Sequence, residues 1–146
     1  MNTENQLQIE RDCQRLILDA VHYVDNREFE AFADCFSREG KLFRPGQPQP
    51  LQGREAILAA YLSRPATRMT RHICTNMRVL PEADGRMRVT SYVLLHASGL
   101  SSATETTTAT ADQPAAVEVK VGEFDDLCVF EDGRWLIAER SARFVM

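Results

Sequence analysis

The chain has few of the features that mark nucleic-acid-binding or membrane-spanning proteins. It carries 17 Lys and Arg against 21 Asp and Glu, a formal net charge of -4, and its only lysines are Lys41 and Lys120. Because binding to a nucleic-acid backbone needs clustered positive charge, no nucleic-acid partner is expected. No apolar run approaches the roughly 18 residues that span a bilayer, and residues 1–8 do not resemble a secretory leader. We therefore predict a cytoplasmic protein with no membrane partner.

Cysteine is sparse and scattered. Cys13, Cys35, Cys74 and Cys128 form no C-x-x-C pair and have no histidine at ligand spacing, a pattern typical of small buried side chains rather than a zinc site or disulfide framework. A nucleophilic cysteine stays open, although nothing nearby favours a lowered thiol pKa. Phosphate-binding glycine loops, dinucleotide fingerprints and the common hydrolase motifs are also missing. We predict no metal and no cofactor.

What is present indicates one domain, 1–146, that begins with helices. A hydrophobic fraction of 44% suffices for a core. Apolar residues recur at helical spacing over 6–24 and again over 29–36, and 55–62 is rich in helix formers. Asp25 and Glu28 resemble an acidic capping box before the second helix. A short strand is expected at 41–44 and a loop over 44–53.

The second half has the pattern of strands. Residues 69–80 and 86–98 predict one hairpin, and 117–130 and 135–145 predict another, with a turn signal at Asp132-Gly133. Residues 99–114 predict a mobile loop, ragged hairpin tip or lid. Helices grouped before strands indicate an α+β fold. Because the long strands are apolar on both faces, we expect a second subunit to cover one face in a homodimer.

Five short motifs in this order resemble the SnoaL-like branch of the NTF2-like superfamily. They are the aromatic-x-Asp element at 23–25 with its acidic-aromatic continuation, the Gly-x-x-x-Ile helix start at 53–57, the His-x-x-x-Asn strand at 72–76, and the segments 122–126 and 133–135. The resemblance implies a cone in which a curved, mixed and mostly antiparallel sheet wraps three N-terminal helices around a small-molecule pocket.

Asp25 and His72 are the predicted catalytic residues. Asp25 continues the apolar stripe of the first helix by one turn, so its carboxylate can face the pocket. In the scytalone-dehydratase-like interpretation that the resemblance implies, this carboxylate orients the His72 imidazole, which acts as general base or acid. The alternative for Asp25 is a helix N-cap, and for His72 a strand histidine with a structural partner.

Six further residues are candidates for substrate binding. Tyr23 could polarise a carbonyl, Asn76 shares strand parity with His72, and Asp126 lies at strand spacing among apolar residues, where a buried carboxylate needs a partner such as Arg140. The resemblance adds His96, which loosely matches a second pocket histidine, and Phe124, which stands where many relatives have tyrosine. Tyr92 completes the set. Each also has a structural interpretation, above all an Asp126–Arg140 ion pair.

Three functions fit these residues. The first is a cofactor-independent lyase or isomerase acting on a small apolar cyclic, polyketide-like or steroid-like molecule. The second is a non-catalytic subunit similar to the small (beta) subunit of aromatic-ring-hydroxylating dioxygenases, for which a trimer is expected. The third is a ligand-binding module without catalysis. Fold alone does not choose among them.

Overall fold

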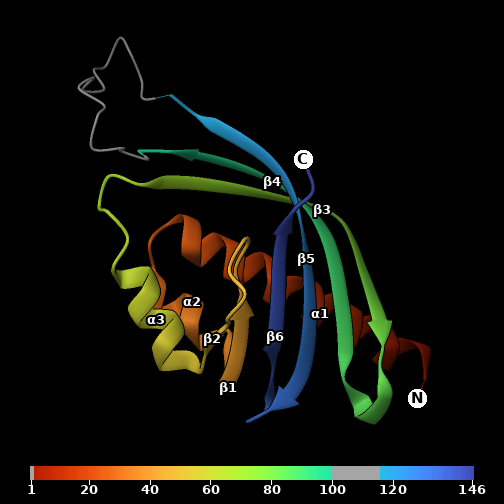
Figure 1. Ribbon diagram of the computed structural model, residues 1–146. Helices are drawn as coiled ribbons and strands as arrows, with labels where there is room; N and C mark the ends of the chain where they lie inside the picture. Colours follow the sequence, from red (N-terminus) through yellow and green to blue (C-terminus); the bar gives the residue numbers. More distant parts are fainter. Residues whose placement is uncertain (1, 100–115) are drawn as a thin grey trace.

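Three helices pack against one six-stranded sheet in the computed structural model, which describes residues 2–99 and 116–146 (Figure 1). The helices are α1 (Thr3–Asp25), α2 (Phe29–Asp34) and α3 (Arg54–Leu62). The strands are β1 (Phe36–Phe43), β2 (Leu51–Gln52), β3 (Met69–Pro81), β4 (Met87–Ser98), β5 (Glu118–Glu131) and β6 (Arg134–Phe144), with a short 3₁₀ turn, η1 (Ala83–Gly85), between β3 and β4.

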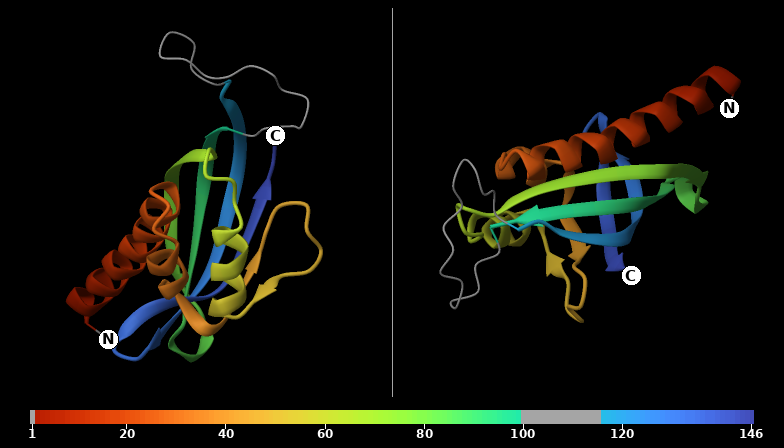
Figure 2. Two further views of the ribbon diagram at one scale, coloured as in Figure 1. Left: turned by 90° about the vertical axis from the view of Figure 1, so that its left-hand side faces the viewer. Right: turned by 90° about the horizontal axis from the view of Figure 1, so that it is seen from above.

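The sheet is mixed and mostly antiparallel, in the order β2-β1-β6-β5-β4-β3. Only β1 and β6 are parallel to each other. The long strands β3, β4 and β5 bend strongly, so that one half of each passes over the helices and the other half runs down beside them (Figures 1 and 2). This arrangement confirms the predicted α+β cone.

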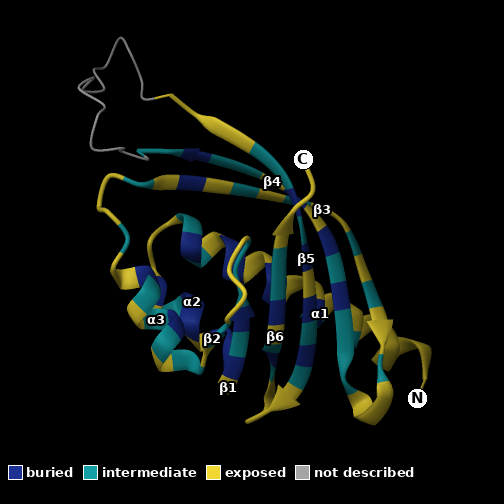
Figure 3. Cartoon of the chain, in the orientation of Figure 1, coloured by how far each residue is buried: buried dark blue, intermediate teal, exposed yellow. Residues whose placement is uncertain are grey.

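The core lies between the helices and the concave face of the sheet. One face of α1 is buried from Cys13 to Val24, as its helical apolar spacing predicts. Phe29 and Phe32 of α2 join it, and Phe36 extends the cluster into β1. Buried residues follow the inner faces of the strands, while the N-terminal turns of α1 stay exposed (Figure 3). Among the described residues, no helix is long and apolar enough to cross a membrane.

The structure corrects the predicted start of the sheet. Strand β1 begins at Phe36, inside the segment predicted as the second helix, and β2 lies in the predicted loop. Gly40, which was expected to end a turn before the strand, instead lies inside β1, where the pairing of β1 with β6 shifts register between Phe36 and Lys41. A Cβ at Gly40 would lie 2.9 Å from the carbonyl oxygen of Ser37. Only glycine fits this irregularity without displacing backbone.

Two other expectations have a different outcome. The predicted capping box is wrong: Asp25 is the last residue of α1, and Glu28 at the N-cap of α2 makes no side-chain capping bond. The predicted loop or lid over 99–114 lies, apart from Gly99, outside the described residues.

Candidate active site

The Asp25 carboxylate lies against the first residues of β3. Its Oδ1 accepts hydrogen bonds from His72 Nδ1 at 2.6 Å and from Thr70 Oγ at 2.8 Å, and its Oδ2 accepts the His72 backbone N–H at 2.8 Å. Arg71 donates to the Asp25 backbone carbonyl at 3.0 Å. The end of α1 is therefore tied to β3 by side chain and main chain together, which holds the His72 ring in one orientation.

The charge state of this pair follows from its surroundings. The Asp25 and His72 side chains are only 7% and 14% exposed. Burial alone raises the pKa of Asp25, but the hydrogen bonds and charge of His72, with the Thr70 hydroxyl, lower it below the ordinary value. Asp25 is therefore ionised at neutral pH. Because an ionised carboxylate only accepts hydrogen bonds, Nδ1 of His72 must carry a proton, so that Nε2 is the acceptor whenever the ring is neutral.

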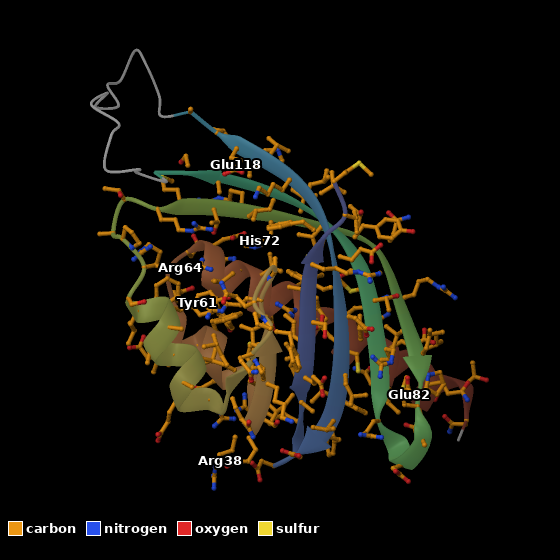
Figure 4. All side chains as sticks on the ribbon, in the orientation of Figure 1. Arg38, Tyr61, Arg64, His72, Glu82 and Glu118 are labelled. Carbon is orange, nitrogen blue, oxygen red and sulfur yellow. The ribbon has the colours of Figure 1, made fainter. Side chains whose placement is uncertain are left out.

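His72 lines a cavity of about 210 Å³ between the helices and the sheet. Asp25 lies behind His72 and does not line it. The volume exceeds the roughly 150 Å³ of an apolar cavity that accepts benzene, so a small ring system fits. Much of the wall is apolar or aromatic, contributed by Val21, Val24, Phe32, Leu42, Tyr61, Val93, Leu95 and Phe124. His72 lies on β3 above α1, Tyr61 lies in the last turn of α3, and Arg64 lies just beyond the end of that helix (Figure 4).

A buried ion pair, Asp126–Arg140, lies beside this cavity, and its arginine lines the wall. Asp126 on β5 is fully buried and faces Arg140 on β6, whose Nε and Nη2 donate to the two carboxylate oxygens at 2.6 and 3.2 Å. Burial lowers the pKa of Arg140, but the facing Asp126 more than offsets this and raises it, so the guanidinium stays charged. Arg140 also stacks 4.0 Å over the centre of the Phe124 ring, which lies 6.2 Å from the His72 ring. The pair therefore positions Phe124 beside His72.

The structure does not bring the other candidates to this cavity. Tyr23 lines a separate hollow, which α1 forms with the α2 region and the β5–β6 hairpin and which Trp135 also lines. Tyr92 is 54% exposed, and His96 alternates with the inward-facing Leu95 and Ala97, which places it on the outer face of the sheet.

Asn76 is exposed because a bulge changes the parity of β3. His72 and Cys74 face the helices, but the pairing with β4 shifts between Thr75 and Arg78, and Met77 and Val79 then face inward. Asn76 adopts a positive φ of 53° at this point. Asparagine tolerates this left-handed conformation better than most residues. The backbone at the bulge therefore accounts for asparagine at position 76, and its side chain does not line the cavity.

Several lining residues were missing from the sequence prediction. Thr70 has the strand parity of His72 and could have been found from it. Arg44, Arg64 and Arg68 carry no such signal, because each lies in a connection beside a proline or at a strand end. All three line the cavity.

Three of the cysteines are not activated nucleophiles. Burial raises the pKa of the Cys35 and Cys74 thiols to about 11, and a hydrogen bond with Cys13 together with burial raises the pKa of Cys128. Within residues 2–99 and 116–146, no group of three or more His, Cys, Asp or Glu side chains could hold a metal ion.

The curved sheet around the helices, with a cavity between sheet and helices, defines an NTF2-like cone. The chain belongs to the SnoaL-like domain family, whose model matches residues 5–141. No curated protein matches the chain in sequence.

Solved structures with the same fold include three informative neighbours. A candidate scytalone dehydratase from Novosphingobium aromaticivorans is 20% identical, with a TM-score of 0.80 over 99% of this chain and 89% of its own. A Catenulispora acidiphila protein in complex with S-DNPA is 22% identical, with a TM-score of 0.73 over 94% of both chains. A candidate aromatic ring hydroxylase from N. aromaticivorans is 16% identical, with a TM-score of 0.77 over 96% of this chain and 91% of its own.

Proposed function

We propose that the protein is a cofactor-independent lyase or isomerase that moves a proton on a small, largely apolar cyclic molecule. The observation that carries the proposal is the 2.6 Å contact between Asp25 Oδ1 and His72 Nδ1 beside the cavity that His72 lines. With Nδ1 protonated, Nε2 is the ring nitrogen available to a bound molecule. No hydrogen bond to this atom occurs among the described residues. A neutral imidazole whose Nε2 is free to accept a proton can act as a general base.

The reaction begins with removal of a proton from the carbon beside a carbonyl group. His72 Nε2 takes the proton, and Asp25 stabilises the imidazolium that forms, as an orienting carboxylate does in other acid–base pairs. Return of the proton to another carbon completes an isomerisation. Its delivery to a hydroxyl on the adjacent β-carbon, with loss of water, completes a dehydration. The S-DNPA complex of the C. acidiphila neighbour supports a small-molecule ligand for this fold.

The shared first step can be measured without knowing the natural substrate. We expect the protein to catalyse exchange of the α-protons of 1-tetralone for solvent deuterium, followed by proton NMR. A His72→Gln variant should lose this exchange, whereas His96→Gln should retain it, because His96 is on the outer face of the sheet. Formation of 1-naphthol from 3-hydroxy-1-tetralone then separates a lyase from an isomerase.

A folded His72→Gln protein with wild-type exchange would rule out this mechanism. Wild-type protein that binds cyclic ketones but exchanges no protons would favour the ligand-binding module. Co-purification with a large iron-sulfur partner would favour the dioxygenase-subunit alternative, which needs no proton transfer. The expected homodimer and cytoplasmic location stay predictions.

A further inference from the structure

Three arginines from two connections of the chain line the cavity that His72 also lines. Arg44 follows β1, Arg64 follows α3, and Arg68 directly precedes β3. The guanidinium of Arg64 stacks 4.1 Å from the centre of the Tyr61 ring. Arg64, just after α3, and His72 on β3 both line this cavity (Figure 4). The cavity wall is therefore apolar and aromatic in part but strongly cationic in another part.

These arginines have unused hydrogen-bonding capacity. The Nε atoms of Arg44 and Arg68 are shielded from solvent and have no hydrogen-bond partner among the described residues. An unpaired buried N–H costs free energy, so a native site with two such groups calls for a ligand or another explanation. Guanidinium N–H groups match the oxygens of a carboxylate or phosphate.

The nearby carboxylates already have other partners. Glu123 lines the cavity, but its Oε2 accepts Arg143 Nε at 2.9 Å. Glu118 lies with Arg68 in the adjoining hollow and pairs with Lys120 at 3.2 Å. Within the described part of the chain, none of the three arginines forms an ion pair with Asp or Glu.

A fourth arginine fixes the segment that carries two of them. Arg27 Nη1 donates to the Arg68 carbonyl at 3.2 Å, and its Nη2 donates to the Arg64 carbonyl at 3.4 Å. Burial lowers the pKa of Arg64, and the charges of Arg68, Arg44 and Arg27 lower it further. Positive charges therefore lie close together in the ligand-free protein, and a bound anion would reduce the repulsion between them.

We propose that Arg44, Arg64 and Arg68 bind an anionic oxygen group, a carboxylate or a phosphate, carried by the cyclic substrate of this cavity. The inference rests on the proposed function and narrows its substrate to acidic cyclic molecules. The anionic group is held at the arginines while the ring occupies the apolar part of the cavity beside His72. The arginines then select and orient the substrate, and His72 carries the proton.

Calorimetric titration with three matched naphthalene probes tests this site. The wild-type protein should bind 2-naphthoate or 2-naphthyl phosphate at least about tenfold more tightly than the neutral 2-naphthamide, as expected for charge-assisted hydrogen bonds. The tighter of the two anions identifies the group. The Arg44→Gln/Arg68→Gln double variant should lose the preference while its amide affinity stays unchanged. Arg38→Gln, at an exposed position away from the cavity, should keep the preference.

Two results overturn the anion site. One is equal affinity for all three probes, or no binding of any. The other is an undiminished anion preference in the folded double variant. The His72→Gln variant should bind the anions normally, because it keeps the arginines. A protein that prefers the anions but exchanges no protons would contradict only the proposed proton transfer. A protein that exchanges protons but shows no anion preference would contradict only the proposed substrate class.

Discussion

The carboxylate of Asp25, at the end of the first helix, and the imidazole of His72, 47 residues later, meet at 2.6 Å. The Asp25 oxygens also accept the Thr70 hydroxyl and the His72 backbone N–H. Three donors from one strand thus converge on one carboxylate. The ring beyond it faces the cavity, and the predictions below depend on this geometry.

Asp25→Asn should slow proton exchange by about 10²-fold or more, because the amide cannot hold the His72 tautomer or stabilise the imidazolium. The exchange rate at saturating ketone should fall much more than the apparent affinity, since Asp25 does not line the cavity. Asp19→Asn, on the exposed side of the same helix, is the matched control. Equal rates for Asp25→Asn and wild type would show that the ring needs no orienting carboxylate.

The same variant should reveal a pH-dependent contribution to stability. The pKa of Asp25 is lowered in the folded protein. Its contribution to the free energy of unfolding is therefore present above the unfolded-state pKa of about 3.9 and is lost as the pH falls through the folded-state pKa. We expect Asp25→Asn to destabilise the fold by about 1–3 kcal/mol at pH 7, and by less at pH 3. Urea unfolding at both values measures this, and a pH-independent difference would contradict it.

Breaking the Asp126–Arg140 pair should be costly. Because both side chains are almost fully buried, Asp126→Asn or Arg140→Met alone leaves one group without its partner and should cost about 3–5 kcal/mol. The double replacement Asp126→Leu/Arg140→Met should recover a large part of that loss in urea unfolding. If the double variant is as unstable as the sum of the single variants, the pair does not act as a unit.

The arginine cluster should make the ligand-free protein less stable than it could be. Arg68→Gln removes one of several like charges and an unpartnered buried N–H, so it should stabilise the free protein by up to about 1 kcal/mol. Added sodium chloride should reduce this gain by screening the repulsion. Thermal unfolding at low and high salt measures both effects. A destabilised Arg68→Gln protein at low salt would mean that Arg68 has a structural partner.

The parts of the molecule that could be predicted from the sequence are those in which buried residues recur at the regular spacing of a helix or a strand. The buried face of α1 follows helical spacing, and the Asp126–Arg140 contact follows from alternation on paired strands. Asn76 was misplaced because alternation fails at a bulge, which no periodic pattern indicates. Strand β1 was shortened because Phe36 fits the apolar spacing of the preceding helix equally well.

The cavity arginines were beyond prediction for a different reason. Arg44, Arg64 and Arg68 come together only because the connections after β1 and after α3 both border the cavity that His72 lines. Such long-range proximity is a property of the folded chain and not of local residue order. Tyr23 shows the converse, since it lies close to Asp25 in sequence but lines a different hollow from the one that His72 lines.

The most direct test of the central claim is nitrogen-15 NMR of the His72 ring, recorded at a pH where the ring is neutral, with His22→Gln and His96→Gln variants used for assignment. We predict a neutral ring protonated at Nδ1, with a strongly deshielded Nδ1 proton, an unprotonated Nε2, and loss of this pattern in Asp25→Asn. A neutral ring protonated at Nε2 would contradict the account, because Asp25 would then not hold the Nδ1 proton and Nε2 could not act as the base.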